Sequence, residues 1–308
     1  MRGSVDYCAG VIETEGLTKR YGPRDAVSNL TVSIPRGVIA GFVGPNGSGK
    51  TTTIRMLLGL VRPTAGTAQV MGHSITHPRQ YLHRIGALIE GPAFYPGLSA
   101  RANLQVLATL GGFPHARIPG LLEQVGLADR ARDRVGGYSL GMKQRLGVAA
   151  ALLPEPELLI LDEPANGLDP PGIHEMRALM RTLRDAGATI FVSSHLLGEL
   201  EQVADWLVVL KDGASLFAGP TAEVVGARSG GLVVRPERAA ELDAVERIAK
   251  SRGYAATRRD GALHITAPAD FAGALNRACM DGGITLVELH AAQATLEESF
   301  LTMIEGGH

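Results

Sequence analysis

A phosphate-binding loop is the clearest chemical pattern in the chain. Gly44-x-x-x-x-Gly49-Lys50-Thr51 joins a run of apolar residues to a segment with helical spacing. Glycines let backbone N–H groups turn towards an anion, and the positive end of the following helix adds to the attraction. Lys50 supplies a charge to the β- and γ-phosphates of a nucleotide, and the Thr51 hydroxyl is placed to ligate Mg²⁺. A chance glycine turn is the alternative, but the strand-to-helix setting favours nucleotide binding.

Two carboxylates follow a second apolar run. Leu158–Leu161 reads as a buried strand, and Asp162 and Glu163 come directly after it. The carboxyl ends of parallel strands border the crevice where ligands bind in α/β proteins. Asp162 would hold Mg²⁺ through water, and Glu163 could orient or deprotonate an attacking water. Taken alone, the pair is as easily a solvated strand end, but the phosphate loop upstream favours catalysis.

Two further features fit the same chemistry. His195 follows the apolar run Thr189–Val192, so we expect it at the same sheet edge as Glu163, where it can contact a γ-phosphate. A lone histidine is more often structural than catalytic. Ser139 opens the helical stretch Ser139–Arg145 as an N-cap, and a capped helix N-terminus is itself an anion site. A second phosphate site in one chain makes sense if two copies share a nucleotide.

Buried strands that alternate with helices position these residues. Val38–Val43 is a continuous apolar run suited to a strand buried on both faces, as are Leu158–Leu161, Thr189–Val192 and Trp206–Leu210. Such alternation predicts a parallel α/β sheet. Before it, the period-two pattern of Leu30, Val32 and Ile34 predicts half-buried antiparallel strands. Residues 98–153 read as mostly helical, with Ser99 as an N-cap, and Asp185–Gly187 supplies a helix stop.

The pattern changes after Gly219-Pro220, and we place a domain boundary near Gly219–Gly231. The predicted order is β-α-β-β-α-β, that of a ferredoxin-like unit. Its strands are expected at Leu232–Val234, Tyr254–Thr257, Leu263–Thr266 and Ile284–Leu289, with helices through Leu242 and Ile248 and through Phe271 and Leu275. Thr295 and Glu298 form a capping box that predicts a last helix.

Composition excludes several classes of protein. The 308 residues carry 30 basic and 31 acidic side chains, a balance that disfavours a protein that coats nucleic acid. The two cysteines, Cys8 and Cys279, are too few for a disulfide framework or a cysteine zinc site. No stretch approaches the ~20 apolar residues of a membrane span, and the N-terminus lacks a signal-peptide pattern. We therefore expect a protein of the cytoplasm, without a membrane span of its own.

These motifs, in this order, resemble the ATP-binding subunit of an ABC transporter over about residues 11–220. Gly44–Thr51 is similar to Walker A, Leu158–Glu163 to Walker B, Ser139–Arg145 to the signature, Gly167–Asp169 to the D-loop and His195 to the switch histidine. The resemblance implies that Glu163 and His195 are catalytic and that Thr51, Glu90 and Asp162 hold Mg²⁺. It implies ATP contacts from Tyr21, stacked on adenine, and from Gly44, Pro45, Asn46, Gly47, Ser48, Gly49, Lys50, Thr51, Thr52, Ser139 and Gly141, with Asp169 in the D-loop.

Two departures separate the chain from the common pattern. The family signature reads Leu-Ser-Gly-Gly-Gln, but here Leu140 and Met142 replace the first Gly and the Gln. Glu90 stands where the family has the glutamine of the Q-loop; it keeps an oxygen for Mg²⁺ but adds negative charge. Both departures resemble the bacitracin- and lantibiotic-resistance branch of exporters, as does the C-terminal stretch Leu296–Phe300, which reads Leu-Glu-Glu-x-Phe.

The resemblance implies a P-loop ATPase core with an antiparallel β subdomain and a helical subdomain, followed by a small α+β ferredoxin-like domain. We expect a tail over residues 1–10, the ATP-binding domain over 11–220 with its helical subdomain at about 98–155, and an accessory or dimer-contact domain over 221–308. The implied function is an ATP-hydrolysing motor for a drug, peptide-antibiotic or lipid-like cargo.

The implied partners are a separately encoded membrane permease and a second copy of an ATP-binding subunit, paired head to tail around ATP and Mg²⁺. The chain would then lie on the inner face of the cell membrane, and no nucleic-acid partner is expected. A soluble ABC-type ATPase acting on ribosomes or nucleic acid is the alternative; such proteins usually carry two cassettes or a long coiled-coil insertion. A P-loop kinase or GTPase would leave Ser139–Arg145 without a purpose.

Overall fold

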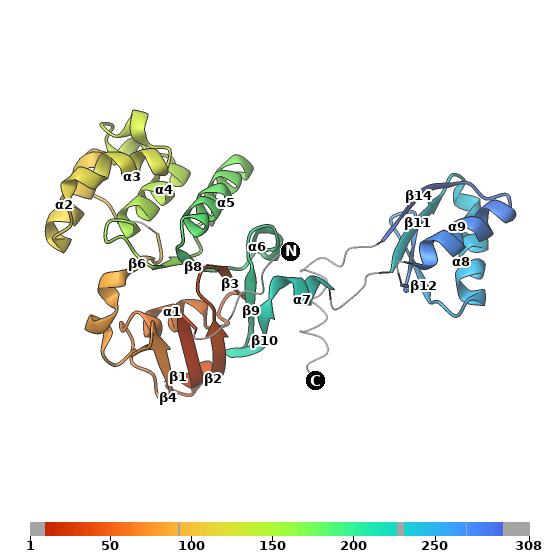
Figure 1. The fold of residues 1–308 in the computed structure, drawn as a ribbon, viewed down its shortest axis with the longest axis horizontal. Coiled ribbons are helices and arrows are strands. Elements are labelled where there is room, and N and C mark those ends of the chain that lie inside the picture. Colours follow the sequence, from red (N-terminus) through yellow and green to blue (C-terminus); the bar gives the residue numbers. More distant parts are fainter. Residues whose placement is uncertain (1–9, 92, 227–230, 269, 292–308) are drawn as a thin grey trace. The chain divides into compact units, whose positions relative to one another are not determined.

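The computed structural model describes residues 10–91, 93–226, 231–268 and 270–291. Contacts within the chain divide it into two compact units, Met1–Thr221 and Ala222–His308. Within the described residues, every helix is too short or too polar to cross a lipid bilayer. The elements of each unit are shown in Figure 1.

A six-stranded sheet forms the centre of the first unit, in the order β10-β9-β3-β8-β7-β6. Its strands are β3 (Ile39–Val43), β6 (Ile85–Leu88), β7 (Leu158–Asp162), β8 (Thr189–Ser194), β9 (Trp206–Lys211) and β10 (Ala214–Pro220). The pairs β9-β3, β3-β8, β8-β7 and β7-β6 are parallel, whereas β10 pairs with β9 antiparallel. All residues of β3, β7 and β8 are buried, which confirms the strands predicted from continuous apolar runs. The loops that follow β3, β7 and β8 therefore leave one edge of this sheet.

A second, antiparallel sheet lies in the same unit, in the order β2-β1-β4-β5. It contains β1 (Ile12–Tyr21), β2 (Arg24–Ile34), β4 (Ala65–Val70) and β5 (His73–Ser74). Leu30, Val32 and Ile34 are buried and alternate with exposed residues, as the period-two pattern predicts. The turn between β1 and β2 carries Tyr21 at its start.

Helices complete the first unit. They are α1 (Lys50–Leu57), α2 (Ala100–Gly111), α3 (Ile118–Gln124), α4 (Leu140–Ala151), α5 (Pro170–Asp185) and α6 (Leu197–Glu201), and α7 (Thr221–Gly226) begins at the last residue of this unit. Figure 1 shows α2, α3 and α4, which contact one another, gathered away from the antiparallel strands β1, β2 and β4. Ser99 and Ser139 cap α2 and α4, and Gly187, in the left-handed region, follows the end of α5. The prediction that residues 98–153 are mostly helical is confirmed.

The second unit is a four-stranded antiparallel sheet, in the order β12-β13-β11-β14, with two helices. Its elements are β11 (Leu232–Pro236), α8 (Leu242–Ser251), β12 (Ala256–Arg259), β13 (Ala262–Ile265), α9 (Phe271–Asp281) and β14 (Leu286–Ala291). Leu232, Val234, Leu263 and Ile265 pack against Val245 and Leu275 in one buried cluster. The order β-α-β-β-α-β and the ferredoxin-like arrangement are confirmed.

Two strand predictions in this unit begin two residues too early. Tyr254 and Ile284 donate backbone hydrogen bonds to Ala249 and Cys279, so each closes the helix before it rather than opening a strand. Both are apolar because they pack on the core, and the Tyr254 ring lies 4.4 Å from that of Phe271. In the sequence, a buried residue in the turn that ends a helix therefore looks like the first residue of a strand. The helix predicted at Thr295 lies outside the described residues.

Candidate functional site

The phosphate loop joins β3 to α1, and its shape depends on glycine. Gly49 has φ +101° and is the N-cap of α1, and a Cβ at this position would lie 2.4 Å from the carbonyl oxygen of Ala26. A side chain is therefore excluded there on both conformational and steric grounds. The N–H groups of the first helical turn, which have no intrahelical acceptors, remain available to an anion. The loop has the form that a phosphate site requires.

Lys50 is held inside this loop. Its side chain is 6% exposed, and Nζ donates a 2.7 Å hydrogen bond to the carbonyl oxygen of Gly44. The same Nζ lies 3.4 Å from Oε1 of Glu163. The buried ammonium thus sits between the loop and an acid that follows a different strand. It is placed to neutralise phosphate charge.

Asp162 lies at the end of β7 and is fixed from two sides. Thr51 Oγ1 donates to Asp162 Oδ2 at 2.9 Å, and Ser193 Oγ donates to Asp162 Oδ1 at 2.5 Å. Thr51 and Asp162, predicted to share a Mg²⁺ ion, are thus in direct contact. Ser193 faces Asp162 across the β7–β8 register and is completely buried. The sequence analysis did not predict this contact. The signal that could have indicated it is a hydroxyl side chain at the end of one strand, next to a strand that ends in an acid.

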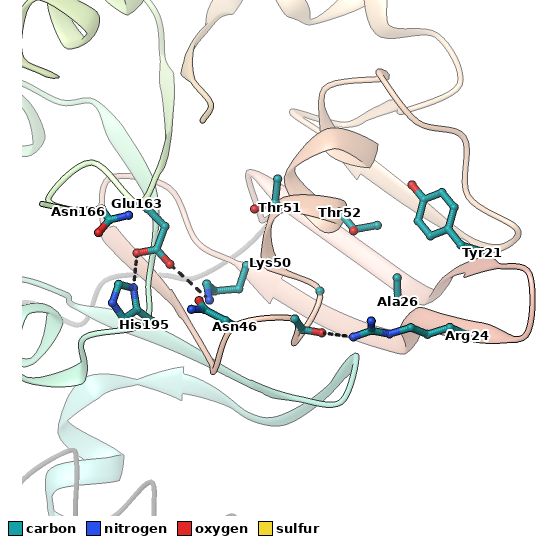
Figure 2. A pocket seen from close by; sticks show the side chains of 12 residues that line it. Tyr21, Arg24, Ala26, Asn46, Lys50, Thr51, Thr52, Glu163, Asn166 and His195 are labelled. Atoms are coloured by element: carbon teal, nitrogen blue, oxygen red, sulfur yellow. Dashed lines mark hydrogen bonds and ion pairs between the residues drawn. The ribbon is translucent and has the colours of Figure 1, made fainter. Parts of the chain in front are cut away.

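Glu163 is the next residue, and its backbone takes a left-handed conformation with φ +50°. Its N–H donates to Ser193 Oγ at 2.9 Å, which anchors the turn. Its side chain lies between two groups: Oε1 faces Lys50, and Oε2 is 2.8 Å from Nδ1 of His195 (Figure 2). A carboxylate held at both oxygens is oriented for proton transfer rather than free to rotate. The predicted pair Glu163 and His195 is therefore brought together.

A second acid, Glu199 on α6, interacts electrostatically with both Glu163 and His195. Burial raises the pKa of Glu199, and the negative charge of Glu163 raises it further, whereas Arg177 and His195 lower it. The side chain borders a small cavity behind the catalytic edge with Met176 and Ser194. Sequence reasoning did not single it out.

One cavity of about 580 Å³ collects most of the predicted nucleotide contacts. It is lined by Tyr21, Asn46, Gly47, Gly49, Lys50, Thr51, Thr52, Glu163 and His195, and also by Arg24, Ala26 and Asn166. Figure 2 shows Tyr21 at one end and Glu163 with His195 at the other, with the phosphate loop between them. A molecule with a planar base and a chain of phosphates fits this layout, and the volume is typical of ligand pockets.

Two cations that the sequence motifs did not indicate lie at the Tyr21 end of this cavity: Arg24 lines it, and Lys19 contacts the Tyr21 ring from outside the lining. Tyr21 is 49% exposed, and Lys19 Nζ lies 5.0 Å from the centre of its ring. Arg24 Nη2 approaches the carbonyl oxygen of Gly47 at 3.5 Å. The turn between β1 and β2 brings Arg24 there, and no spacing rule in the sequence connects the two residues.

A second cavity of about 710 Å³ shares Thr51, Glu163 and Asn166 with the first. It is also lined by Glu90, Gly91, Ala93, Leu140, Lys143, Gln144, Asp162 and Gly167. Thr51, Glu90 and Asp162, the three residues predicted to hold Mg²⁺, thus line one space. Glu90 has φ +57°, and its carboxylate accepts a hydrogen bond from Arg55 of α1, a contact that sequence reasoning did not foresee.

The donor set fits Mg²⁺. Hydroxyl and carboxylate oxygens are the ligands this ion prefers, and Thr51 and Asp162 present them side by side. Ser48 Oγ, in the phosphate loop, is buried and has no hydrogen-bond partner among the described residues. A buried hydroxyl without a partner is costly unless a ligand satisfies it.

The signature residues Ser139 and Gly141 and the D-loop residue Asp169 line neither cavity. Ser139 is exposed and accepts the N–H of Met142 at 3.2 Å, and Asp169 accepts the N–H of Gly172 at 3.1 Å. Before the signature, Tyr138 is buried and donates to the carbonyl oxygen of Arg130 at 2.6 Å. Burial raises the pKa of the Tyr138 phenol, so this donor keeps its proton at neutral pH. These hydrogen bonds hold the signature loop in place, and its Ser139 side chain is exposed outside both cavities.

Comparison with known proteins gives a consistent result. The family profile described as ABC transporter matches residues 27–166. The chain is 40% identical to the bacitracin transport ATP-binding protein of Bacillus licheniformis, over 96% of this chain and 98% of that protein. It is 42% identical to a lantibiotic transport ATP-binding protein of Streptococcus pyogenes, over 66% of this chain and 88% of that protein. A solved structure of an ATP-binding subunit of an ABC transporter is 31% identical, with a TM-score of 0.63, and covers 70% of this chain and 92% of that one.

Proposed function

The chain belongs to the ATP-binding subunits of ABC transporters, which hydrolyse ATP, and from this premise we propose that it drives the export of a peptide antibiotic of the bacitracin class. The observation that carries the proposal is the 40% identity to a bacitracin transport ATP-binding protein over nearly the full length of both chains. The lantibiotic relative covers only 66% of this chain, which favours the bacitracin class. The named relatives are transport proteins, which favours a transporter over a soluble ATPase acting on ribosomes or nucleic acid.

Hydrolysis would use the residues that line the two cavities. Lys50 neutralises negative charge on the β- and γ-phosphates, while Tyr21 stacks on the adenine at the other end. Glu163 accepts a proton from the attacking water, with its orientation set by Lys50 and His195. Mg²⁺, held by Thr51 and Asp162 with Glu90 nearby, would supply charge neutralisation on the phosphate oxygens.

A second copy of the chain would complete the site. Ser139 and Gly141 lie outside both cavities and Ser139 is exposed, so they are free to meet the nucleotide of another subunit. Two copies would close head to tail around two ATP molecules, and each signature would contact the γ-phosphate bound by the other chain. A separately encoded membrane permease would convert this closure into transport, with the chain at the inner face of the cell membrane.

We propose the following domain organisation for the chain. Residues 11–220 form the ATP-binding domain, with a helical subdomain at about 98–155, and residues 1–10 precede it as a tail. Residues 221–308 act as an accessory or dimer-contact domain. The two compact units, divided after Thr221, support this boundary.

Replacement of the proposed base tests the hydrolytic role. Glu163→Gln should retain ATP binding but lower turnover by about 10²-fold or more, because the variant cannot accept a proton. It should also accumulate as an ATP-bound dimer, because closure needs the nucleotide and opening needs hydrolysis. Purified protein supplies both readouts, through phosphate release and sedimentation with and without ATP.

Glu155→Gln is the matched control. Glu155 also has a left-handed backbone, with φ +55°, and it also forms an ion pair, 2.8 Å from Arg117. It lies outside both cavities, so its replacement should leave turnover within about twofold. Near-normal turnover in Glu163→Gln would remove Glu163 from the proposed role.

The cargo is tested in cells. A sensitive bacterium that produces this chain with its membrane partner should tolerate more bacitracin, and the same cells with Glu163→Gln should not. Unchanged bacitracin tolerance beside raised tolerance to a lantibiotic would reassign the cargo and leave the ATPase role intact.

A further inference from the structure

Two loops that each contribute a residue to the lining of the second cavity contact each other through reciprocal leucine–glycine pairs. The signature loop, Ser139–Gly141, opens α4, and the D-loop, Gly167–Asp169, precedes α5. A Cβ placed on Gly167 would lie 2.8 Å from Cδ2 of Leu140, and a Cβ placed on Gly141 would lie 3.6 Å from Cδ2 of Leu168. Each loop therefore offers a leucine to a glycine of the other.

The contact is tight on the side of Leu140. Gly167 has φ +73°, a conformation that side chains rarely adopt, so the space above its Cα is open to a neighbour. Leu140 occupies that space at a distance that leaves no room for one further methyl group. The other side of Leu140 remains in solvent, with 48% of the residue exposed.

Both loops are also tied to rigid elements. Ser139 and Asp169 cap the helices that follow them, by accepting the N–H groups of Met142 and Gly172. Leu140 and Gly167 line the cavity that contains Asp162 and Glu163. A displacement of either loop is thus transmitted to the N-terminus of a helix and to the wall of the catalytic cavity.

We propose that Leu140 is a positioning residue that locks the signature loop to the D-loop, so that the two loops move as one body when two subunits close around ATP. A glycine at position 140 would have no side chain to reach Gly167, so the leucine adds a link that the common signature lacks. The proposal rests on the ATP-bound dimer described above. It predicts that loss of the leucine slows hydrolysis without weakening nucleotide binding to the single chain.

A double-mutant cycle on purified full-length protein tests this link. Leu140→Ala and Leu168→Ala should each lower kcat by about threefold to thirtyfold, which lies within the range of couplings between contacting residues, with little change in KM for ATP. The double variant should lose less than the product of the two single losses, because both leucines hold the same pair of loops together. Leu140→Met, which keeps an apolar chain of similar reach, should recover most of the rate. Leu110→Ala, at a leucine that is 80% exposed, is the control.

A structural readout keeps the test independent of activity. Without nucleotide, Leu140→Ala should speed amide hydrogen exchange over residues 166–168 by severalfold, and Leu110→Ala should not. Fully additive losses in kcat, or exchange unchanged by Leu140→Ala, would overturn the proposal. A wild-type chain that fails to hydrolyse ATP would instead contradict the proposed function, and the exchange measurement would still decide whether the two loops are linked.

Discussion

The phosphate-binding region and the signature loop are built from similar parts but are completed to different degrees. Around the phosphate loop, the side chains of Lys50, Asp162 and Ser193 are buried. Lys50 donates a hydrogen bond to the carbonyl oxygen of Gly44 and Ser193 donates one to Asp162, so each of these side chains is held in one direction. In the signature loop, Ser139 is exposed and its side chain caps only its own helix. The difference supports the proposal that the phosphate loop is complete within one chain and that the signature loop meets the nucleotide of a second subunit.

The largest expected effect comes from a substitution in the phosphate-binding region. Lys50→Ala should abolish detectable ATP binding, because the loop would hold the γ-phosphate without its buried cation. Lys19→Ala removes a cation that lies outside the cavity lining but contacts the Tyr21 ring, with Nζ 5.0 Å from the ring centre. An exposed contact of that kind is worth about 0.5–1 kcal/mol, so affinity should fall by only about fivefold or less. Equilibrium binding of a fluorescent ATP analogue measures both, and equal losses would remove the distinction between the two ends.

A substitution in the signature loop should separate ATP binding from ATP hydrolysis. Ser139→Arg should leave ATP affinity of the single chain nearly intact but block dimer closure and reduce hydrolysis by about 10²-fold or more, because a bulky cation would fill the contact surface. The readouts are equilibrium binding and phosphate release on the same preparation. Equal loss of affinity in Ser139→Arg and Lys50→Ala monomers would show that Ser139 does not act across an interface.

Ser99 supplies a matched control for this change. It caps α2 as Ser139 caps α4, with its hydroxyl accepting the N–H three residues ahead at 3.1 Å. Ser99→Arg and Ser139→Arg should each cost about 1 kcal/mol of stability through the lost cap. Only Ser139→Arg should affect hydrolysis, so a similar fall in turnover for both would point to helix damage.

The smallest effect is expected at the boundary between the two regions. Glu90→Gln should retain substantial hydrolysis but need about twofold to fivefold more Mg²⁺ for the half-maximal rate, because a neutral oxygen attracts the ion less than a charged one. Transport through the proposed membrane partner should fall more than hydrolysis does if, as we propose, the loop that carries Glu90 links the site to the permease.

Arg55→Gln is the control of opposite sign for Glu90. Arg55 holds the Glu90 carboxylate, so its removal frees that group for the metal and should lower the Mg²⁺ requirement. Rate curves against Mg²⁺ that superimpose for all three proteins would leave Glu90 without a special role.

Much of the fold could be predicted from the sequence because its requirements are local. Gly49 and Lys50 mark a phosphate loop wherever a buried strand runs into a helix, and that setting is visible in the apolar pattern itself. The same holds for Asp162 at the end of an apolar run, and for the β-α-β-β-α-β order after residue 231. In each case neighbours in the chain dictate the structure.

What the sequence could not show depends on residues far apart in the chain. Ser193 meets Asp162 only through the register of β7 and β8, which no local pattern reports. Arg55 reaches Glu90 across 35 positions, and Arg24 reaches Gly47 because of how one turn folds over the loop. Tertiary structure brings these polar groups together, so the site contains polar contacts that its sequence motifs do not predict.

Mixing two inactive variants tests most directly whether two chains complete each other's sites. In a mixed dimer of Lys50→Ala and Ser139→Arg, one site carries both defects, while the other joins an intact phosphate loop to an intact signature. Equal amounts of the two proteins should recover about a quarter of the wild-type hydrolysis rate, because half of the dimers are mixed and each has one complete site of two. A mixture no more active than the separate variants would contradict the account.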